Sequence, residues 1–105
     1  MGEEEKVNEI ELTKLIAEFL QKRGLETTGV HEEAGAFQDA DIIAYGYDRA
    51  WIIEVKRVSS PSAIRTGVEQ LLKRMEKYKY APNPVFLLVC FNAETGSPKV
   101  KRIHK

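Results

Sequence analysis

Residues 41–56 read DIIAYGYDRAWIIEVK, and this stretch decides the fold that we expect. It contains two short runs of mainly β-branched and aromatic residues, residues 40–47 and 50–57, and these residue types favour strands. Asp48-Arg49 separates the two runs, so the stretch predicts a β-hairpin. Side chains alternate along a strand, and apolar residues occupy both faces in the middle of each run. The hairpin should therefore be covered on both sides.

The register of this hairpin predicts a cluster of charges at one end. With Tyr47-Asp48 as a two-residue loop, Asp41 lies opposite Glu54, and Lys56 shares their face. Directly opposed residues have Cβ atoms ~5 Å apart, so two carboxylates there repel each other, and partial burial strengthens the repulsion. One interpretation is that Lys56 neutralises both carboxylates at a solvated end of the sheet. We favour a second interpretation, in which the carboxylates bind a divalent cation that accepts oxygen ligands, such as Mg²⁺.

The rest of the chain predicts two helices and three further strands. The expected elements are a helix over residues 9–23, strands over 25–33, 40–47 and 50–57, a helix over 63–79, and strands over 85–91 and 99–103. Apolar spacing predicts that these helices bury Ile10, Leu12, Leu15, Ile16, Phe19 and Leu20, and then Ile64, Val68, Leu71, Leu72 and Met75, with Arg65, Lys73, Arg74 and Lys77 facing outward. The run at 85–91 is apolar throughout, which is typical of a strand covered on both faces. We expect one α/β domain over residues 1–105, a mixed β-sheet flanked by helices in the order α-β-β-β-α-β-β.

The composition excludes several classes of protein. The 105 residues include 16 Lys plus Arg and 16 Asp plus Glu, so bulk attraction to polyanions is excluded and any nucleic-acid affinity must come from local patches, such as the basic residues 99–105. The single cysteine, Cys90, excludes a disulfide framework and a cysteine-rich zinc site, and we expect it in the core. No apolar run approaches the ~20 residues of a membrane span, and the acidic N-terminus lacks the apolar segment of a signal peptide. We therefore expect a cytoplasmic protein with no membrane partner.

The hairpin and its surroundings resemble the PD-(D/E)xK nuclease superfamily, which has the restriction-endonuclease-like fold. The resemblance rests on Asp41-Ile42-Ile43-Ala44, on Glu54-Val55-Lys56, and on Glu69-Gln70-Leu71 in the second helix. It extends from the first helix to residue 91, and among the branches it is most similar to archaeal Holliday-junction resolvases and to small Mrr-like and RecB-like nucleases. The resemblance implies metal-dependent hydrolysis of DNA phosphodiester bonds, with selectivity for branched or junction DNA as one expectation.

The resemblance also implies a set of metal ligands. Asp41 and Glu54 would hold Mg²⁺, for which Mn²⁺ can substitute, and the main-chain carbonyl of Val55 often joins them in the superfamily. A glutamate on the first helix commonly completes such a site. Glu11 and Glu18 are both candidates for it because they are seven residues apart on one side of that helix. Spacing to Asp41 favours Glu11, and we keep both.

Further roles and partners follow from the same resemblance. Lys56 would position or deprotonate the attacking water, and Gln70 would orient Lys56 or that water. DNA contacts are expected from the basic residues on and beside the second helix, together with the C-terminal tail: Arg57, Arg65, Lys73, Arg74, Lys77 and Lys79. A homodimer or a subunit of a larger complex is expected, because so small a nuclease has little surface for recognition. The alternative function is a non-catalytic module that keeps the fold for DNA binding or assembly.

Overall fold

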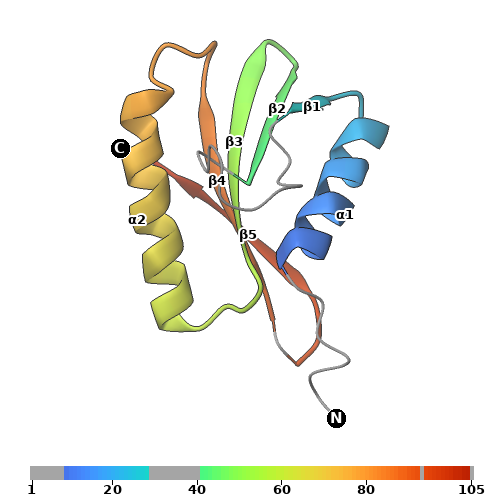
Figure 1. The fold of residues 1–105 in the computed structure, drawn as a ribbon, viewed down its shortest axis with the longest axis vertical. Coiled ribbons are helices and arrows are strands. Elements are labelled where there is room, and N and C mark those ends of the chain that lie inside the picture. The colour runs from blue at the N-terminus through green and yellow to red at the C-terminus, as the bar shows by residue number, and fades with distance from the viewer. Residues whose placement is uncertain (1–8, 29–40, 93, 105) are drawn as a thin grey trace.

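The structure is a computed structural model that describes residues 9–28, 41–92 and 94–104. It confirms the α/β class and the expected element order, with a five-stranded sheet between two helices (Figure 1). The elements are α1 (Glu9–Lys22), β1 (Glu26–Thr28), β2 (Ile42–Gly46), β3 (Arg49–Lys56), α2 (Pro61–Lys77), β4 (Val85–Phe91) and β5 (Pro98–Ile103).

The sheet is mixed, and β3 lies at its centre. The strands follow the order β1-β2-β3-β4-β5, in which β3 and β4 are parallel and the other neighbours are antiparallel. A parallel pair needs a long crossover connection, and α2 provides it. In the hairpin, Ile42 pairs with Ile53, which confirms the predicted register. That register places the charged end of β3 at the edge where α2 begins (Figure 1).

The turn of the hairpin consists of Tyr47 and Asp48. Their φ angles are 55° and 61°, which is the left-handed region that a type I′ turn requires at both central residues. The Tyr47 hydroxyl donates a hydrogen bond of 2.6 Å to the Arg23 carbonyl oxygen, and the Asn83 side-chain amide donates one of 2.9 Å to the Asp48 carbonyl oxygen. These bonds tie the turn to the end of α1 and to the loop before β4. Strand β3 therefore begins at Arg49, one residue before the expected position.

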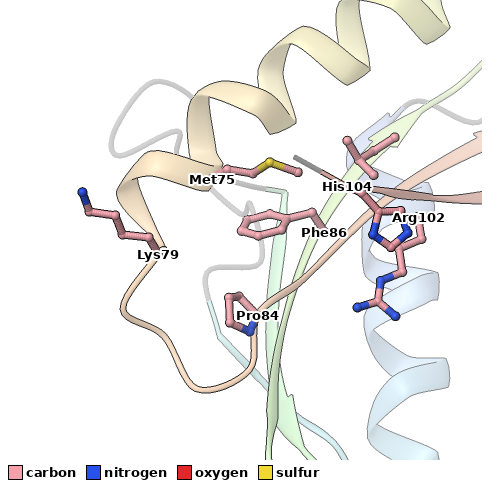
Figure 2. A pocket seen from close by; sticks show the side chains of 7 residues that line it. Met75, Lys79, Pro84, Phe86, Arg102 and His104 are labelled. Carbon is pink, nitrogen blue, oxygen red and sulfur yellow. The ribbon is translucent and has the colours of Figure 1, made fainter.

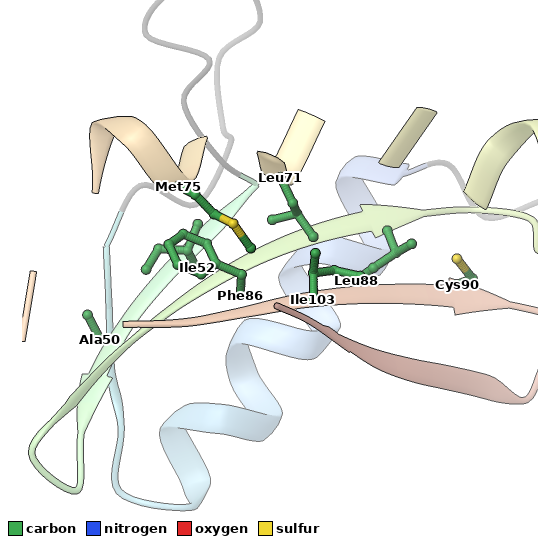
Figure 3. Packing of buried hydrophobic residues seen from close by; sticks show 8 residues of the cluster. All are labelled: Ala50, Ile52, Leu71, Met75, Phe86, Leu88, Cys90 and Ile103. Atoms are coloured by element: carbon green, nitrogen blue, oxygen red, sulfur yellow. The ribbon is translucent and has the colours of Figure 1, made fainter. Parts of the chain in front are cut away.

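Both faces of the sheet carry an apolar core, as the two-sided hairpin predicts. One core lies under α1 and consists of Ala17, Ile42, Ile53, Val55 and Val89. The other lies under α2 (Figure 3) and consists of Ala50, Ile52, Leu71, Met75, Phe86, Leu88, Cys90 and Ile103. The prediction that Cys90 is a core thiol is confirmed, since its side chain is buried.

Helix α2 approaches β4 closely because of Gly67. A Cβ atom on Gly67 would lie 2.5 Å from Leu88 Cδ1, so a larger residue would force either the Leu88 side chain or the helix to shift. The helix starts with a Ser60 cap, whose Oγ accepts a hydrogen bond of 3.2 Å from the Ala63 N–H, and Pro61 occupies the first turn. It therefore begins at Pro61, two residues before the expected start, and it ends at Lys77.

The buried faces of the two helices differ in part from those that the apolar spacing predicts. Leu15 and Phe19 were expected to be buried and are 57% and 54% exposed, because α1 turns Ala17 and its neighbours toward the sheet instead. On α2, Leu72 is 45% exposed while Leu71 is fully buried. In the described part of the chain, no helix is long and apolar enough to cross a membrane.

Candidate active site

Asp41 lies where the ladder between β2 and β3 ends. Ile42 is the first residue of β2 that is paired with β3 in the described part of the chain. The Val55 N–H donates a hydrogen bond of 2.7 Å to Asp41 Oδ2, and the carboxylate thus takes the place of a backbone acceptor. This bond fixes Asp41 beside the residue that separates Glu54 from Lys56.

Glu54 is a carboxylate within the core on the α2 side of the sheet. Its exposed fraction is 4%, and its position in β3 is in register with Leu88 of β4, which is itself buried. Among the residues that the structure describes, Glu54 Oε1 has no hydrogen-bond partner. A buried ionised carboxylate costs free energy unless a proton, a cation or hydrogen bonds compensate it. The arrangement around Glu54 therefore favours either protonation or a bound cation.

The surroundings raise the pKa of Glu54 from 4.5 to about 8. Desolvation by burial is the largest cause, and the negative charge of Asp41 is the next. The positive charges of Arg74 and Lys56 act in the opposite direction, and a side-chain hydrogen bond with Asp41 adds to the rise. Without a metal, Glu54 is thus largely protonated at neutral pH, and a cation at the two carboxylates would displace that proton.

Arg74 was expected to face outward and contact DNA, and the structure places it elsewhere. Its side chain is 15% exposed, and its Nε lies 3.8 Å from Glu54 Oε1. Its Nη1 also donates a hydrogen bond of 3.0 Å to the Gln70 carbonyl oxygen. Arg74 comes three residues after Leu71 and directly before Met75, so it lies at the border of the buried stripe of α2. The buried carboxylate attracts the guanidinium inward, and Arg74 belongs to the site rather than to the outer surface.

Gln70 occupies the same side of α2, one turn before Arg74. Gln70 Oε1 is buried and has no hydrogen-bond partner within the described residues. Helix α2 runs opposite in direction to β3 (Figure 1), so one turn toward its N-terminus corresponds to a step from Glu54 toward Lys56. The ~5.4 Å rise of a turn and the ~6.6 Å spacing of two strand residues are similar. This spacing favours a position of Gln70 near the half-buried Lys56, and its role stays a prediction.

The structure does not join a glutamate of α1 to the two carboxylates. Among the described residues, no three His, Cys, Asp or Glu side chains lie close enough together to hold a metal ion. Helix α1 covers the opposite face of the sheet, although its first turn lies at the same end of the molecule as the end of β3 (Figure 1). Glu11 is in that first turn, whereas Glu18 lies two turns away from it. The role of either residue stays a prediction, and the position of Glu11 suits it better.

The residues of this site fit a divalent cation that binds oxygen. Asp41 and Glu54 bring two carboxylates together, and one of them has a buried oxygen with no hydrogen-bond partner among the described residues. Mg²⁺ commonly binds one or two carboxylates and keeps several waters, so a two-carboxylate site needs open space beside it. Asp41 and Lys56 are only half-buried, which leaves that side of the site open to water and substrate. The Val55 carbonyl stays a predicted third ligand.

The other residues predicted to contact DNA lie on the surface. Arg57 follows β3, and Arg65, Lys73 and Lys77 lie along the outer side of α2, all exposed. None of these side chains lines a pocket that the structure describes.

One pocket of the described structure is remote from the carboxylates. It has a volume of about 250 Å³ and lies between the end of α2 and the start of β4 (Figure 2). Its floor includes Phe86 and Pro84, and Lys79 at its rim points away from it and forms an ion pair with Glu76. This pocket contains no carboxylate, so it is not the candidate active site.

Sequence reasoning missed the contact between Arg74 and Glu54. The signal was present, because Arg74 stands four residues after Gln70, which was already assigned to the site. Residues four apart lie on one side of a helix. A basic residue at that spacing, opposite a buried acid on the neighbouring strand, predicts an inward side chain.

Comparison with known proteins agrees with this geometry. A protein-family model, Mrr_cat, described as restriction endonuclease, matches residues 5–94. The match includes α1, the hairpin, α2 and β4, and so every residue assigned to the candidate site. A search of curated proteins found no match.

Proposed function

The chain belongs to this restriction endonuclease family, and from that premise we propose that it is a divalent-metal-dependent nuclease that hydrolyses DNA phosphodiester bonds. The observation that carries the proposal is Glu54, a buried carboxylate that lies beside a second carboxylate and two residues from a lysine. A purely structural role gives no reason to bury this acid next to Asp41, since the two repel. A divalent cation removes the repulsion and gives the pair a function.

Each residue of the candidate site has its own role in the proposed reaction. A divalent cation held by Asp41 and Glu54 would lower the pKa of a water and offset charge on the phosphate. Lys56, on the same face of β3, is placed to hold the attacking water or to offset the charge that develops on the phosphate oxygens. Gln70 offers a buried amide oxygen that would accept a hydrogen bond from Lys56 or from that water. The Val55 N–H keeps Asp41 oriented throughout.

Arg74 has a positioning role in this scheme. It contacts Glu54 from the α2 side, opposite the open side of the site, so it orients the carboxylate without blocking access. Selectivity for branched or junction DNA is part of the proposal, because exposed lysines and arginines contact phosphates more readily than base edges. Assembly as a homodimer is part of it as well, and so is a cytoplasmic location.

A cleavage assay tests the proposal. The wild-type chain would be incubated with Mg²⁺ or Mn²⁺ and with four-way junction, flap, linear duplex and single-stranded DNA, and EDTA would serve as the metal-free control. Glu54→Gln and Lys56→Met keep the side-chain size and should each lower the rate at least about 100-fold. Lys14→Gln, on the far side of α1, removes one charge as well and should leave the rate unchanged.

The assay also separates the alternative function. DNA binding with no cleavage of any substrate, in wild type and variants alike, would contradict the proposal and indicate a non-catalytic module in which Arg74 and Glu54 form only a salt bridge. Cleavage that Glu54→Gln leaves intact would place the active site elsewhere. Thermal unfolding gives an independent readout, because Mn²⁺ should raise the Tm of wild type and not that of Glu54→Gln.

A further inference from the structure

Strand β5 carries two lysines on the same face of the sheet as the catalytic set. In the register of β3 and β4, Lys56 pairs with Cys90, and in the register of β4 and β5, Cys90 pairs with Lys99. Directly paired residues point to the same face. Lys56 and Lys99 therefore lie on the α2 side of the sheet, with the buried Cys90 between them.

A second row runs beside the first. Glu54 pairs with Leu88, and Leu88 pairs with Lys101. Each candidate catalytic residue of β3 thus has a lysine of β5 two strands away, across a buried apolar residue of β4. Neighbouring strands are ~4.8 Å apart, so this separation is about 10 Å.

The space above this part of the sheet is a groove. It has a volume of about 200 Å³ and is lined by Ile64, Leu88, Cys90, Lys99 and Lys101. Leu88 and Cys90 form its floor along β4, below the first half of α2 (Figure 3). The groove is apolar at its base and has lysines on its outer wall. The groove lies on the same side of the sheet as the candidate active site, and Lys56 is the partner of Cys90 in the sheet.

The electrostatic field in the groove is positive. Lys56, Lys99 and Lys101 all act on the Cys90 thiol, each favouring its ionised form, although burial raises the pKa of the thiol more strongly. Three positive charges therefore surround one point on the groove floor. Ile64 comes from the first turn of α2, which contains no acidic residue. The positive end of the helix dipole adds to the lysines there.

We propose that this groove binds the sugar–phosphate backbone of a DNA strand next to the bond that is cleaved, with Lys99 and Lys101 contacting phosphates. The inference rests on the proposed nuclease function and adds the path of the substrate. The lysine wall suits the phosphates, and the partly exposed Ile64 offers an apolar contact for the deoxyribose. The exposed basic residues of α2 are less suited, because Lys73 and Lys77 face away from the side of the sheet that carries Glu54 and Lys56.

Equilibrium binding tests the inference with a matched pair of double variants. Lys99→Gln/Lys101→Gln removes two charges from the groove, and Lys14→Gln/Lys22→Gln removes two exposed charges from α1 on the opposite face. Binding of a fluorescent DNA duplex and a four-way junction would be measured in EDTA between 50 and 200 mM salt. The groove variant should bind about tenfold more weakly at low salt, and the slope of log affinity against log salt should fall by about 2. The α1 variant should match wild type, and a thermal melt checks that both fold.

The outcomes distinguish this inference from the proposed function. If wild type cleaves DNA and the groove variant keeps its affinity and salt slope, the groove proposal is overturned while the nuclease stands. If wild type binds without cleaving and the groove variant alone loses affinity, the groove is supported while the nuclease fails. A loss of affinity in Lys73→Gln/Lys77→Gln that the groove variant does not share would move the DNA to the outer side of α2. Absence of DNA binding by wild type would overturn both.

Discussion

The two faces of β3 are equally buried and chemically opposite. Ile53 and Val55 point toward α1 into an apolar core, and the buried polar residue on that helix is the uncharged Thr13. Ile52 and Glu54 point toward α2, where Arg74 also enters from the helix. Val55 and Glu54 are neighbours in sequence with exposed fractions of 0% and 4%, so burial does not distinguish them. The difference lies in what surrounds each side chain.

This difference indicates which face is shaped by stability and which by chemistry. The α1 face buries apolar groups and one hydroxyl, that of Thr13, and among the described residues it buries no charged side chain. The α2 face differs at one position and then surrounds it with a second acid, a lysine, an arginine and an amide. Sequences carry such local conflicts mainly at functional sites. The comparison therefore locates the site without reference to any known family.

The largest expected effect comes from placing a carboxylate on the apolar face. Val55→Glu would bury an acid beside Ala17 and Val89, where the described structure offers no cation. We expect the free energy of unfolding to fall by at least about 4 kcal/mol, enough to leave little folded protein. Urea denaturation followed by circular dichroism measures this, with Val55→Met as the control for size. If Val55→Glu and Val55→Met were equally stable, the α1 face would tolerate a buried carboxylate as well as the α2 face does.

A smaller effect on stability, of opposite sign, is expected when the buried carboxylate of Glu54 is removed from the α2 face. The pKa of Glu54 is about 8 in the folded chain and near 4.5 in the unfolded chain, so the folded state binds more protons between these values. The free energy of unfolding should therefore decrease as pH rises from about 4.5 to 8, by a few kcal/mol at ~1.4 kcal/mol per pKa unit. Glu54→Gln should remove this decrease and be more stable than wild type at pH 8 without metal. Parallel pH profiles of the two proteins would contradict the raised pKa.

The smallest expected effect concerns Arg74. Its contact with Glu54 is long at 3.8 Å, and at pH 6 Glu54 is largely protonated, so Arg74→Met should change stability by less than about 1 kcal/mol there. At pH 9 Glu54 is ionised, and the same substitution should cost about 1 kcal/mol more. In a Glu54→Gln background, the difference between the costs of Arg74→Met at pH 6 and at pH 9 should vanish. A double-mutant cycle at both pH values measures this, and an interaction energy that is the same at pH 6 and pH 9 would argue against the pair.

The hairpin could be predicted from the sequence because its information is local. The register, the two-sided burial and the meeting of Asp41 with Glu54 follow from a two-residue turn and the alternation of a strand. The crossover to β4 followed from the length of the intervening helix. These features depend on spacing alone, which a sequence contains in full.

Other features depend on how a helix is rotated about its axis and on where a long side chain points, and residue spacing does not determine either. The predicted buried face of α1 was wrong for Leu15 and Phe19, because many residues of that helix are apolar and several of its faces could pack against the sheet. Arg74 was assigned to solvent because its charge favours water, and only the buried acid opposite it explains its position. The basic residues 99–105 were expected to contact DNA, but the position of Lys99 and Lys101 beside the candidate site needed the pairing of β5 with β4, which has no local signature in the sequence. Each of these is a tertiary effect that overrides a residue's own preference.

The order of the elements also bears on how such a site forms and changes. Asp41, Glu54, Lys56, Gln70 and Arg74 all belong to the continuous segment from the start of β2 to the end of α2. The contacts among these residues therefore close short loops. Closing a short loop costs little chain entropy, so such contacts form early in folding. Strand β5 pairs with β4 alone and lies at the edge of the sheet. Substitutions on this outer strand can alter its surface charge during evolution while the inner segment keeps its chemistry.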